Sequence, residues 1–209
     1  MSVRRVAALA ALALVLAACG GASDAGSRVS TSGAPAASSD EPRTSAPADL
    51  LADADLADCP ESDAAVAARE DGLPDLVLPC LGAGPAVRLA GLRGTPTVVN
   101  LWSTWCDACR EEIPLLADLA AGGKVRVLGV DVDDDPASAV SLLAQAGAHY
   151  PSVRDDDRAT QVPLGWVGLP MTLFVDADGV VTFTQRGAVE DSAALARLVR
   201  EHLGVEVAS

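Results

Sequence analysis

The distribution of apolar residues divides the middle of the chain into strand-like and helix-like stretches. Residues 97–102 form a near-continuous apolar run with Asn100 inside it, and residues 125–132 form a second run of the same kind. Such runs are typical of strands that are covered on both faces of a sheet. Between them, residues 107–120 place apolar side chains at helical spacing, interrupted by Pro114. This region therefore predicts a strand, a helix kinked at the proline, and a second strand.

The pattern after residue 132 predicts two further helices and three further strands. A helix is expected to begin near residue 135, where Asp-Pro supplies a capping residue followed by proline. Residues 150–153 are expected to form a short strand. Two more strands, residues 171–175 and 180–184, flank a turn that contains Asp-Gly, and residues 191–203 show the apolar face of a last helix. The sequence thus predicts an α/β fold with a central mixed β-sheet flanked by helices.

The N-terminus has the pattern of an export signal. Arg4 and Arg5 precede an apolar run of about a dozen residues, which is too short for a bilayer span of roughly 20. The sequence Leu-Ala-Ala-Cys that ends at Cys19 resembles the bacterial lipobox, which implies that this cysteine carries a lipid anchor. An uncleaved signal anchor, or a secreted protein with an unmodified cysteine, is the alternative.

The residues after Cys19 predict a tether and then a folded domain. Residues 20–58 are rich in Ala, Ser, Gly, Pro and Asp, so they bury too little apolar surface to offset the entropy of the chain. We therefore expect a lipoprotein signal peptide at residues 1–18, a lipid-anchored flexible linker at residues 19–58, which forms an N-terminal extension, and the folded domain at residues 59–205.

The charge of the chain excludes one class of partner. There are 29 Asp and Glu residues against 15 Lys and Arg residues, and the formal net charge is -14. Because nucleic acid binding needs a basic surface, we expect no nucleic-acid partner. The acidic triplets at residues 133–135 and 155–157 lack the spacing and the glycine of a calcium loop. We interpret them as solvated loop charge and expect no metal site.

The five cysteines can be assigned to three roles. If Cys19 carries lipid, four remain, an even number in an exported and therefore oxidising setting. Cys106 and Cys109 form one pair. Cys59 and Cys80 then form a structural disulfide that closes a loop of about 22 residues and stabilises the fold by roughly 3 kcal/mol, with two unpaired thiols as the alternative.

The C-x-x-C pair at the start of the predicted helix has the chemistry of a redox site. The first sulfur lies beside the unpaired N–H groups and the positive end of the helix dipole, which favour its thiolate. Cys106 is therefore the expected nucleophile. Cys109, one helical turn later, faces the same side and is expected to resolve the mixed disulfide between Cys106 and a substrate.

Three stretches of the chain carry a family resemblance. The sequences LRGTPTVVNLWSTWCDACREEIPLL, GVDVDDDP and GLPMTLFVDADGVV resemble the TlpA- and ResA-like extracytoplasmic thioredoxins over residues 73–203. Trp105, Pro114 and the pair Leu169-Pro170 stand where that family has them. The resemblance implies a thioredoxin-like fold.

The same resemblance implies roles for several residues. The Leu169-Pro170 bond is expected to be cis, with the backbone of residue 169 against the substrate, although the sequence alone leaves a trans bond open. Trp105 is also expected to contact the substrate. Apart from the resemblance, the place of Trp166 in PLGWVGLP means that it either lines the substrate groove beside Pro170 or packs the loop. Glu112 matches an acidic residue placed near the thiols and is the expected proton relay, a surface carboxylate being the alternative.

The function that follows from these observations is thiol-disulfide exchange with protein cysteines. We expect a membrane-anchored, extracytoplasmic oxidoreductase on the outer face of the plasma membrane, monomeric and without a bound cofactor. The resemblance implies protein substrates with cysteines or disulfides, with apocytochrome c as one client, and a membrane thiol carrier as electron donor. Because Asp107 beside Cys106 disfavours its thiolate, we expect a reducing rather than an oxidising couple.

Three other functions are compatible with a fold of this kind. A copper-handling protein of the Sco type would need a C-x-x-x-C pair and a distal histidine, and only His149 and His202 are present. A peroxiredoxin would need proline and threonine where Val99 and Ser103 stand. A non-catalytic adaptor would have no need of the second cysteine of the pair.

Overall fold

The computed structural model describes residues 45–208. Contacts divide the chain into two units, Met1–Asp40 and Glu41–Ser209, and the elements described below all belong to the second unit. The expected signal peptide, the lipidation site at Cys19 and most of the expected linker lie outside the described residues. Within the described part of the chain, no helix is long and apolar enough to cross a bilayer.

A five-stranded mixed sheet forms the centre of the fold, as predicted. The strand order is β5-β4-β3-β6-β7. β4 pairs parallel with β3 and with β5, whereas β6 pairs antiparallel with β3 and with β7. All six residues of β3 are buried, because strands lie on both sides of it and both faces are covered. The five strands are β3 (Thr97–Trp102), β4 (Arg126–Val132), β5 (Ser152–Asp155), β6 (Met171–Val175) and β7 (Val181–Arg186).

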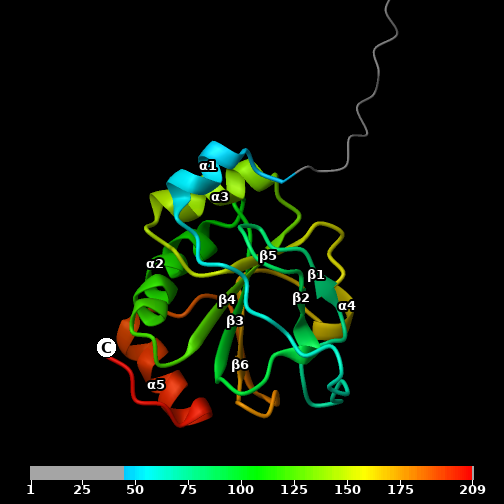
Figure 1. The fold of residues 1–209 in the computed structure, drawn as a ribbon. Coiled ribbons are helices and arrows are strands. Elements are labelled where there is room, and N and C mark those ends of the chain that lie inside the picture. The colour runs from blue at the N-terminus through cyan, green and yellow to red at the C-terminus, as the bar shows by residue number, and fades with distance from the viewer. Residues whose placement is uncertain (1–44, 209) are drawn as a thin grey trace, which may run out of the picture. The chain divides into compact units, whose positions relative to one another are not determined.

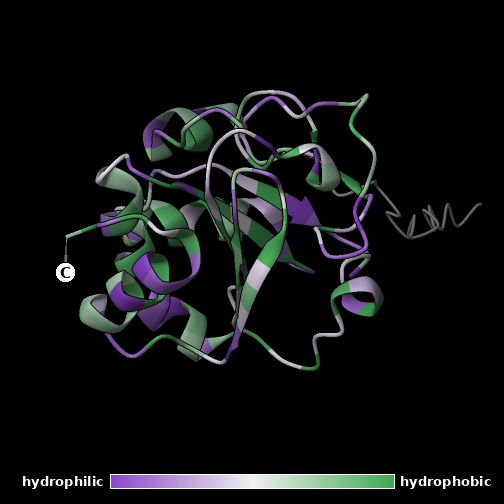
Figure 2. Ribbon diagram, turned by 90° about the horizontal axis from the view of Figure 1, so that it is seen from below, coloured by the Kyte–Doolittle hydropathy of each residue, from purple (hydrophilic) through white to green (hydrophobic). Residues whose placement is uncertain are grey.

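Helices and loops cover both faces of the sheet (Figure 1). A layer of apolar residues lies on each face. One face packs against α2 (Asp107–Ala121), α3 (Pro136–Gln145) and α5 (Ser192–Leu203). The other face is covered by the small hairpin of β1 (Val77–Leu78) and β2 (Val87–Arg88), the 3-10 turn η1 (Leu89–Gly91) and α4 (Gln161–Leu164). Figure 2 shows hydrophobic positions concentrated along the central strands.

Local sequence signals set the ends of the helices. The Asp135 carboxylate accepts a hydrogen bond from Ser138 N at 3.0 Å and caps α3, and proline begins that helix as expected. Asp191 caps α5 in the same way, accepting from Ala194 N at 2.7 Å. α2 continues through Pro114 to residue 121. β5 begins two residues later than predicted, because the pairing with β4 starts at Ser152.

The expected linker boundary at residue 59 is too late. A helix, α1 (Ala48–Ala54), lies inside the segment expected to be flexible and packs against α3. Ala54 is buried, and Leu50, Leu51 and Leu56 are partly buried against the apolar layer of α2, α3 and α5. The average composition of residues 20–58 is that of a linker, so it gave no sign that these few leucines pack against the domain. Their burial favours an ordered segment.

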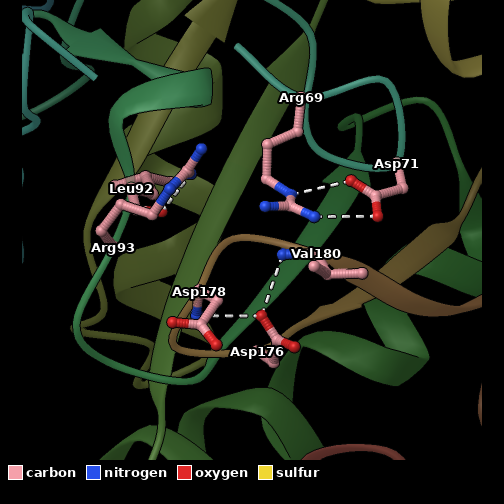
Figure 3. A network of polar contacts seen from close by, with 7 residues as sticks. All are labelled: Arg69, Asp71, Leu92, Arg93, Asp176, Asp178 and Val180. Carbon is pink, nitrogen blue, oxygen red and sulfur yellow. Dashed lines mark hydrogen bonds and ion pairs between the residues drawn. The ribbon is translucent and has the colours of Figure 1, made fainter. Parts of the chain in front are cut away.

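The turn between β6 and β7 lies at the end of the sheet away from the C-terminus of β3. The Asp176 carboxylate accepts hydrogen bonds from Asp178 N at 3.0 Å and Val180 N at 2.9 Å, which close the turn (Figure 3). Beside it, Arg69 and Asp71 form a two-bond ion pair of 2.7 and 3.0 Å. The predicted Asp-Gly turn is therefore present, and the site described next occupies the opposite end of the sheet.

Candidate active site

Cys106 and Cys109 form a disulfide at the point where β3 leads into α2. Cys106 is the N-cap residue of the helix, with φ -97° and ψ 104°, and its sulfur accepts a hydrogen bond from Cys109 N at 3.1 Å. This places the first sulfur at the positive end of the helix dipole. Cys106 is 7% exposed and Cys109 only 1%, so the first sulfur is the one that an incoming sulfur can reach.

The exposed residues around the disulfide differ in polarity. The Trp105 side chain is 55% exposed, so it is available to a substrate as a flat apolar surface. Asp107 is exposed and forms an ion pair with Arg110. That pair reduces the effect of the Asp107 charge on Cys106, which weakens the sequence argument for a reducing couple.

Glu112 is a buried acid in the second turn of α2. Its carboxyl accepts hydrogen bonds from Asn100 Nδ2 at 2.8 Å on β3, from Val189 N at 2.9 Å before α5, and from Thr172 Oγ1 at 3.5 Å on β6. Burial raises the pKa of Glu112, although these hydrogen bonds act in the opposite direction. The alternative of a surface carboxylate is therefore wrong, and a proton relay stays a prediction.

The expected cis peptide bond is present between Leu169 and Pro170. Leu169 packs against the apolar cluster that contains both cysteines. A cavity of about 300 Å³ lies beside it and is lined by residues 166–171 together with Arg186 and Gly187. Trp166 lines this cavity, but its ring is 5% exposed and its Nε1 donates to Thr160 Oγ1 at 3.0 Å. Trp166 therefore also packs the loop, and its contact with substrate stays a prediction.

The second cysteine pair lies at the edge of the sheet. Cys59 and Cys80 form a disulfide, and Cys80 also makes an isolated antiparallel bridge with Val153 of β5. The Cys59 N–H donates to Ala83 O at 2.9 Å. This disulfide therefore holds the segment that follows α1 against the sheet.

The two histidines take part in packing. His149 Nδ1 lies 3.2 Å from Ala54 O and 3.1 Å from Asp55 O, at the end of α1. His202 stacks on Phe183 with 4.1 Å between ring centroids. Among residues 45–208 there is no group of three or more His, Cys, Asp and Glu side chains that could hold a metal ion.

The interpretation of the acidic triplets as solvated charge is wrong for one member of each. Asp134 is 6% exposed and Asp155 is 1% exposed. Asp155 accepts hydrogen bonds from Ala159 N at 2.7 Å and Thr160 N at 3.0 Å, which close the loop after β5. Runs of acids after a strand are usually solvated, so composition gave no sign of which carboxylate turns inward.

Sequence reasoning also missed a buried acid pair beside the redox motif. Asp131, the sixth residue of β4, pairs in register with Trp102 and is 2% exposed. Burial, a hydrogen bond with Asp134 and the negative charges of Asp134 and Asp156 raise the pKa of Asp131 to about 10. The only available signal was an acid inside an apolar strand pattern, GVDV.

Comparison with known proteins gives matches over this domain. Residues 68–198 match the protein family described as Redoxin. The thiol:disulfide interchange protein DsbE of Pseudomonas fluorescens biotype C is 38% identical over 119 residues, which are 56% of this chain and 66% of that protein. The thiol:disulfide interchange protein CycY of Rhizobium leguminosarum bv. viciae is 30% identical over 104 residues, 49% of this chain and 56% of that protein. The chain thus spans about half to two thirds of the length of the curated relatives it matches.

A solved structure gives the same result for the fold. The thiol:disulfide interchange protein of the thioredoxin family from Chlorobium tepidum TLS superposes with a TM-score of 0.54 at 26% identity. The superposition covers 66% of this chain and all of the solved chain, 100%. The predicted thioredoxin-like fold is therefore confirmed.

Proposed function

The chain belongs to the Redoxin family, among its TlpA- and ResA-like extracytoplasmic thioredoxins, and we propose that it is a thiol-disulfide oxidoreductase acting on protein cysteines. One observation carries the proposal: the more exposed sulfur, Cys106, caps α2 and is joined to Cys109 in a disulfide. The names of the relatives DsbE and CycY, thiol:disulfide interchange proteins, support the same reaction.

The reaction proceeds by two exchanges between sulfurs. In the reduced protein, the Cys106 thiolate attacks one sulfur of a client disulfide, forms a mixed disulfide and releases the other client sulfur as a thiolate. The Cys109 thiolate then attacks the Cys106 sulfur, which restores the disulfide seen in the structure and releases the second client thiolate. Two electrons pass to the client, and its two thiolates take up protons. Glu112, which is buried and has a raised pKa, is the group we assign to proton transfer with Cys109.

We propose that the protein reduces its clients, because the surroundings of the Cys106-Cys109 pair are acidic. A carboxylate near Cys106 disfavours its thiolate and so disfavours the reduced protein relative to the disulfide. Asp107 adjoins Cys106 directly, although Arg110 offsets part of its charge. Asp134 adds a second carboxyl, bonded to Thr104 in the same loop. A reduction potential near that of a strong oxidant, roughly -120 mV, would contradict this direction.

The location and partners that we propose rest on the sequence and on the family resemblance. Lipidation at Cys19 would hold it on the outer face of the plasma membrane, where we expect a membrane thiol carrier to reduce it. The haem-site cysteines of apocytochrome c are the client set that the family resemblance favours. The working unit in this proposal is a monomer, and the redox pair itself serves without a bound cofactor.

The test of this function is to trap clients on the full chain in cells. With Cys109→Ser the mixed disulfide on Cys106 cannot be resolved, so proteins should accumulate in reducible adducts. Cys106→Ser is the matched control, because it lacks the attacking sulfur and should trap nothing. Equal recovery from both variants would favour the non-catalytic adaptor. Purified protein should also reduce a model protein disulfide, and a wild type without that activity would refute the proposal.

A further inference from the structure

The residue two positions before the nucleophile is held by hydrogen bonds from two directions. Thr104 donates from its backbone N–H to Asp134 Oδ2 at 2.6 Å and from its hydroxyl to Asp134 Oδ1 at 2.6 Å. Its carbonyl oxygen accepts from Arg110 Nη1 of α2 at 2.7 Å. All three polar groups of Thr104 are therefore engaged, and both oxygens of one carboxyl group are used on this single residue.

Asp134 is itself held by the elements on either side of it in the chain. It is 6% exposed and lies between the end of β4 and the start of α3, so its backbone is anchored by a strand and a helix. A hydrogen bond with Asp131 of β4 links it to the sheet, and this bond is one of the causes that raise the pKa of Asp131. The carboxyl group of Asp134 is therefore anchored between β4 and α3, whereas Thr104 belongs to the loop that carries the redox motif.

This contact bears on the position of the Cys106 sulfur. The Cys106 N–H donates to Ser103 O at 3.2 Å, so the loop around Thr104 determines where Cys106 enters the helix. At that position the Cys106 sulfur accepts a hydrogen bond from Cys109 N at 3.1 Å. Hydrogen bonds to a charged form stabilise it, and this one favours the thiolate of Cys106 in the reduced protein.

We propose that Asp134 is a positioning residue of the redox site, which holds Thr104 so that the Cys106 sulfur stays over the N-terminus of α2. The inference rests on the proposed function, since positioning matters only if Cys106 reacts as a thiolate. Asp134 acts in two opposed ways: its charge disfavours the thiolate, while its two hydrogen bonds maintain the geometry that favours it. Substitutions can separate these effects.

The test compares two variants of the reduced full chain that remove the same charge. Asp134→Asn keeps an oxygen for the Thr104 N–H and an amide for its hydroxyl, whereas Asp134→Ala keeps neither. We expect the pKa of the Cys106 thiol, read from the ultraviolet absorbance of its thiolate, to be about one unit higher in Asp134→Ala than in Asp134→Asn. This corresponds to roughly tenfold slower alkylation of Cys106 by iodoacetamide below the pKa.

A second pair of variants covers the case in which Asp134→Ala fails to fold. Thr104→Val removes only the hydroxyl donor and leaves every charge in place, and Thr104→Ser restores that donor. The valine variant should raise the thiol pKa and the serine variant should rescue it. Asp157→Ala, an exposed acid of the loop after β5, serves as the charge control.

Two results would overturn the proposal. One is an equal thiol pKa in Asp134→Ala and Asp134→Asn, which would mean that the carboxylate acts only through its charge. The other, decisive if Asp134→Ala does not fold, is an equal thiol pKa in Thr104→Val and Thr104→Ser. Neither measurement uses a client protein. A wild type that reduces no protein disulfide would therefore refute the proposed function and leave this comparison intact.

Discussion

Replacing Asp131 with asparagine should stabilise the protein, and more so as the pH rises. The carboxyl group of Asp131 lies on β4, is 2% exposed, and has one oxygen, Oδ1, without a hydrogen-bond partner among the described residues. Its neighbours are mainly acidic: Asp134 and Asp156 oppose its ionisation, and Arg154 favours it more weakly. An asparagine has the same shape and keeps an N–H donor for Asp134.

The magnitude follows from the linkage between protonation and folding. Burial and the neighbouring acids raise the pKa of Asp131 to about 10 in the folded protein, against about 3.9 in an unfolded chain. Between these values the folded state keeps a proton that the unfolded state releases, so the free energy of unfolding falls as the pH rises. One proton is involved, so the free energy of unfolding falls by about 3 kcal/mol from about pH 5 to about pH 7.

Asp131→Asn removes this contribution, so its stability relative to wild type should increase by about 3 kcal/mol over that pH range. The assay is urea unfolding of the oxidised proteins, followed by tryptophan fluorescence at several pH values, with Asp157→Asn as an exposed control. Titrating groups that do not interact with Asp131, Glu112 included, are present in both proteins and cancel in the comparison. A difference between Asp131→Asn and wild type that stays constant with pH would refute the reasoning.

Three further predictions concern other parts of the structure. Glu112→Gln should slow disulfide reduction by about 10²-fold by removing the group assigned to proton transfer, measured as kcat/KM against pH; an unchanged rate and profile would exclude the relay. Replacing Cys59 and Cys80 together by serine should lower the free energy of unfolding by about 3 kcal/mol in urea titrations and leave the reduction potential of the other pair unchanged. Gly129→Ala should cost about 1–3 kcal/mol, because its Cβ would overlap Ser152 Oγ; a wild-type urea midpoint would contradict this close approach.

The parts of the fold that sequence reasoning predicted well are those with a strong local signal. β3 has the predicted bounds, residues 97–102, because a strand covered on both faces must be apolar throughout. The caps at Asp135 and Asp191 were visible as polar residues before apolar periodic stretches. The spacing of Cys106 and Cys109 was sufficient to place both at the start of α2.

What the sequence did not reveal depends on contacts between distant segments. α1 is ordered by packing against α3, nearly a hundred residues later, and its own composition resembles that of a linker. The burial of Glu112 requires Asn100, Thr172 and Val189 from three other elements. No periodicity within α2 shows that these partners exist, so a surface carboxylate was an equally good interpretation before the structure.

The buried acids of this site make stability and reactivity separable. Asp131 is expected to cost stability at neutral pH because it keeps a proton that the unfolded chain loses, yet it also forms a hydrogen bond with Asp134. Asp131→Asn keeps a donor at that position, so it should raise stability while the alkylation rate of Cys106 stays close to wild type. Asp134→Ala should instead slow the alkylation of Cys106, because its contacts with Thr104 are lost. If both variants changed stability and thiol reactivity together, the acid pair would be part of the general fold and the separate role of Asp134 would fail.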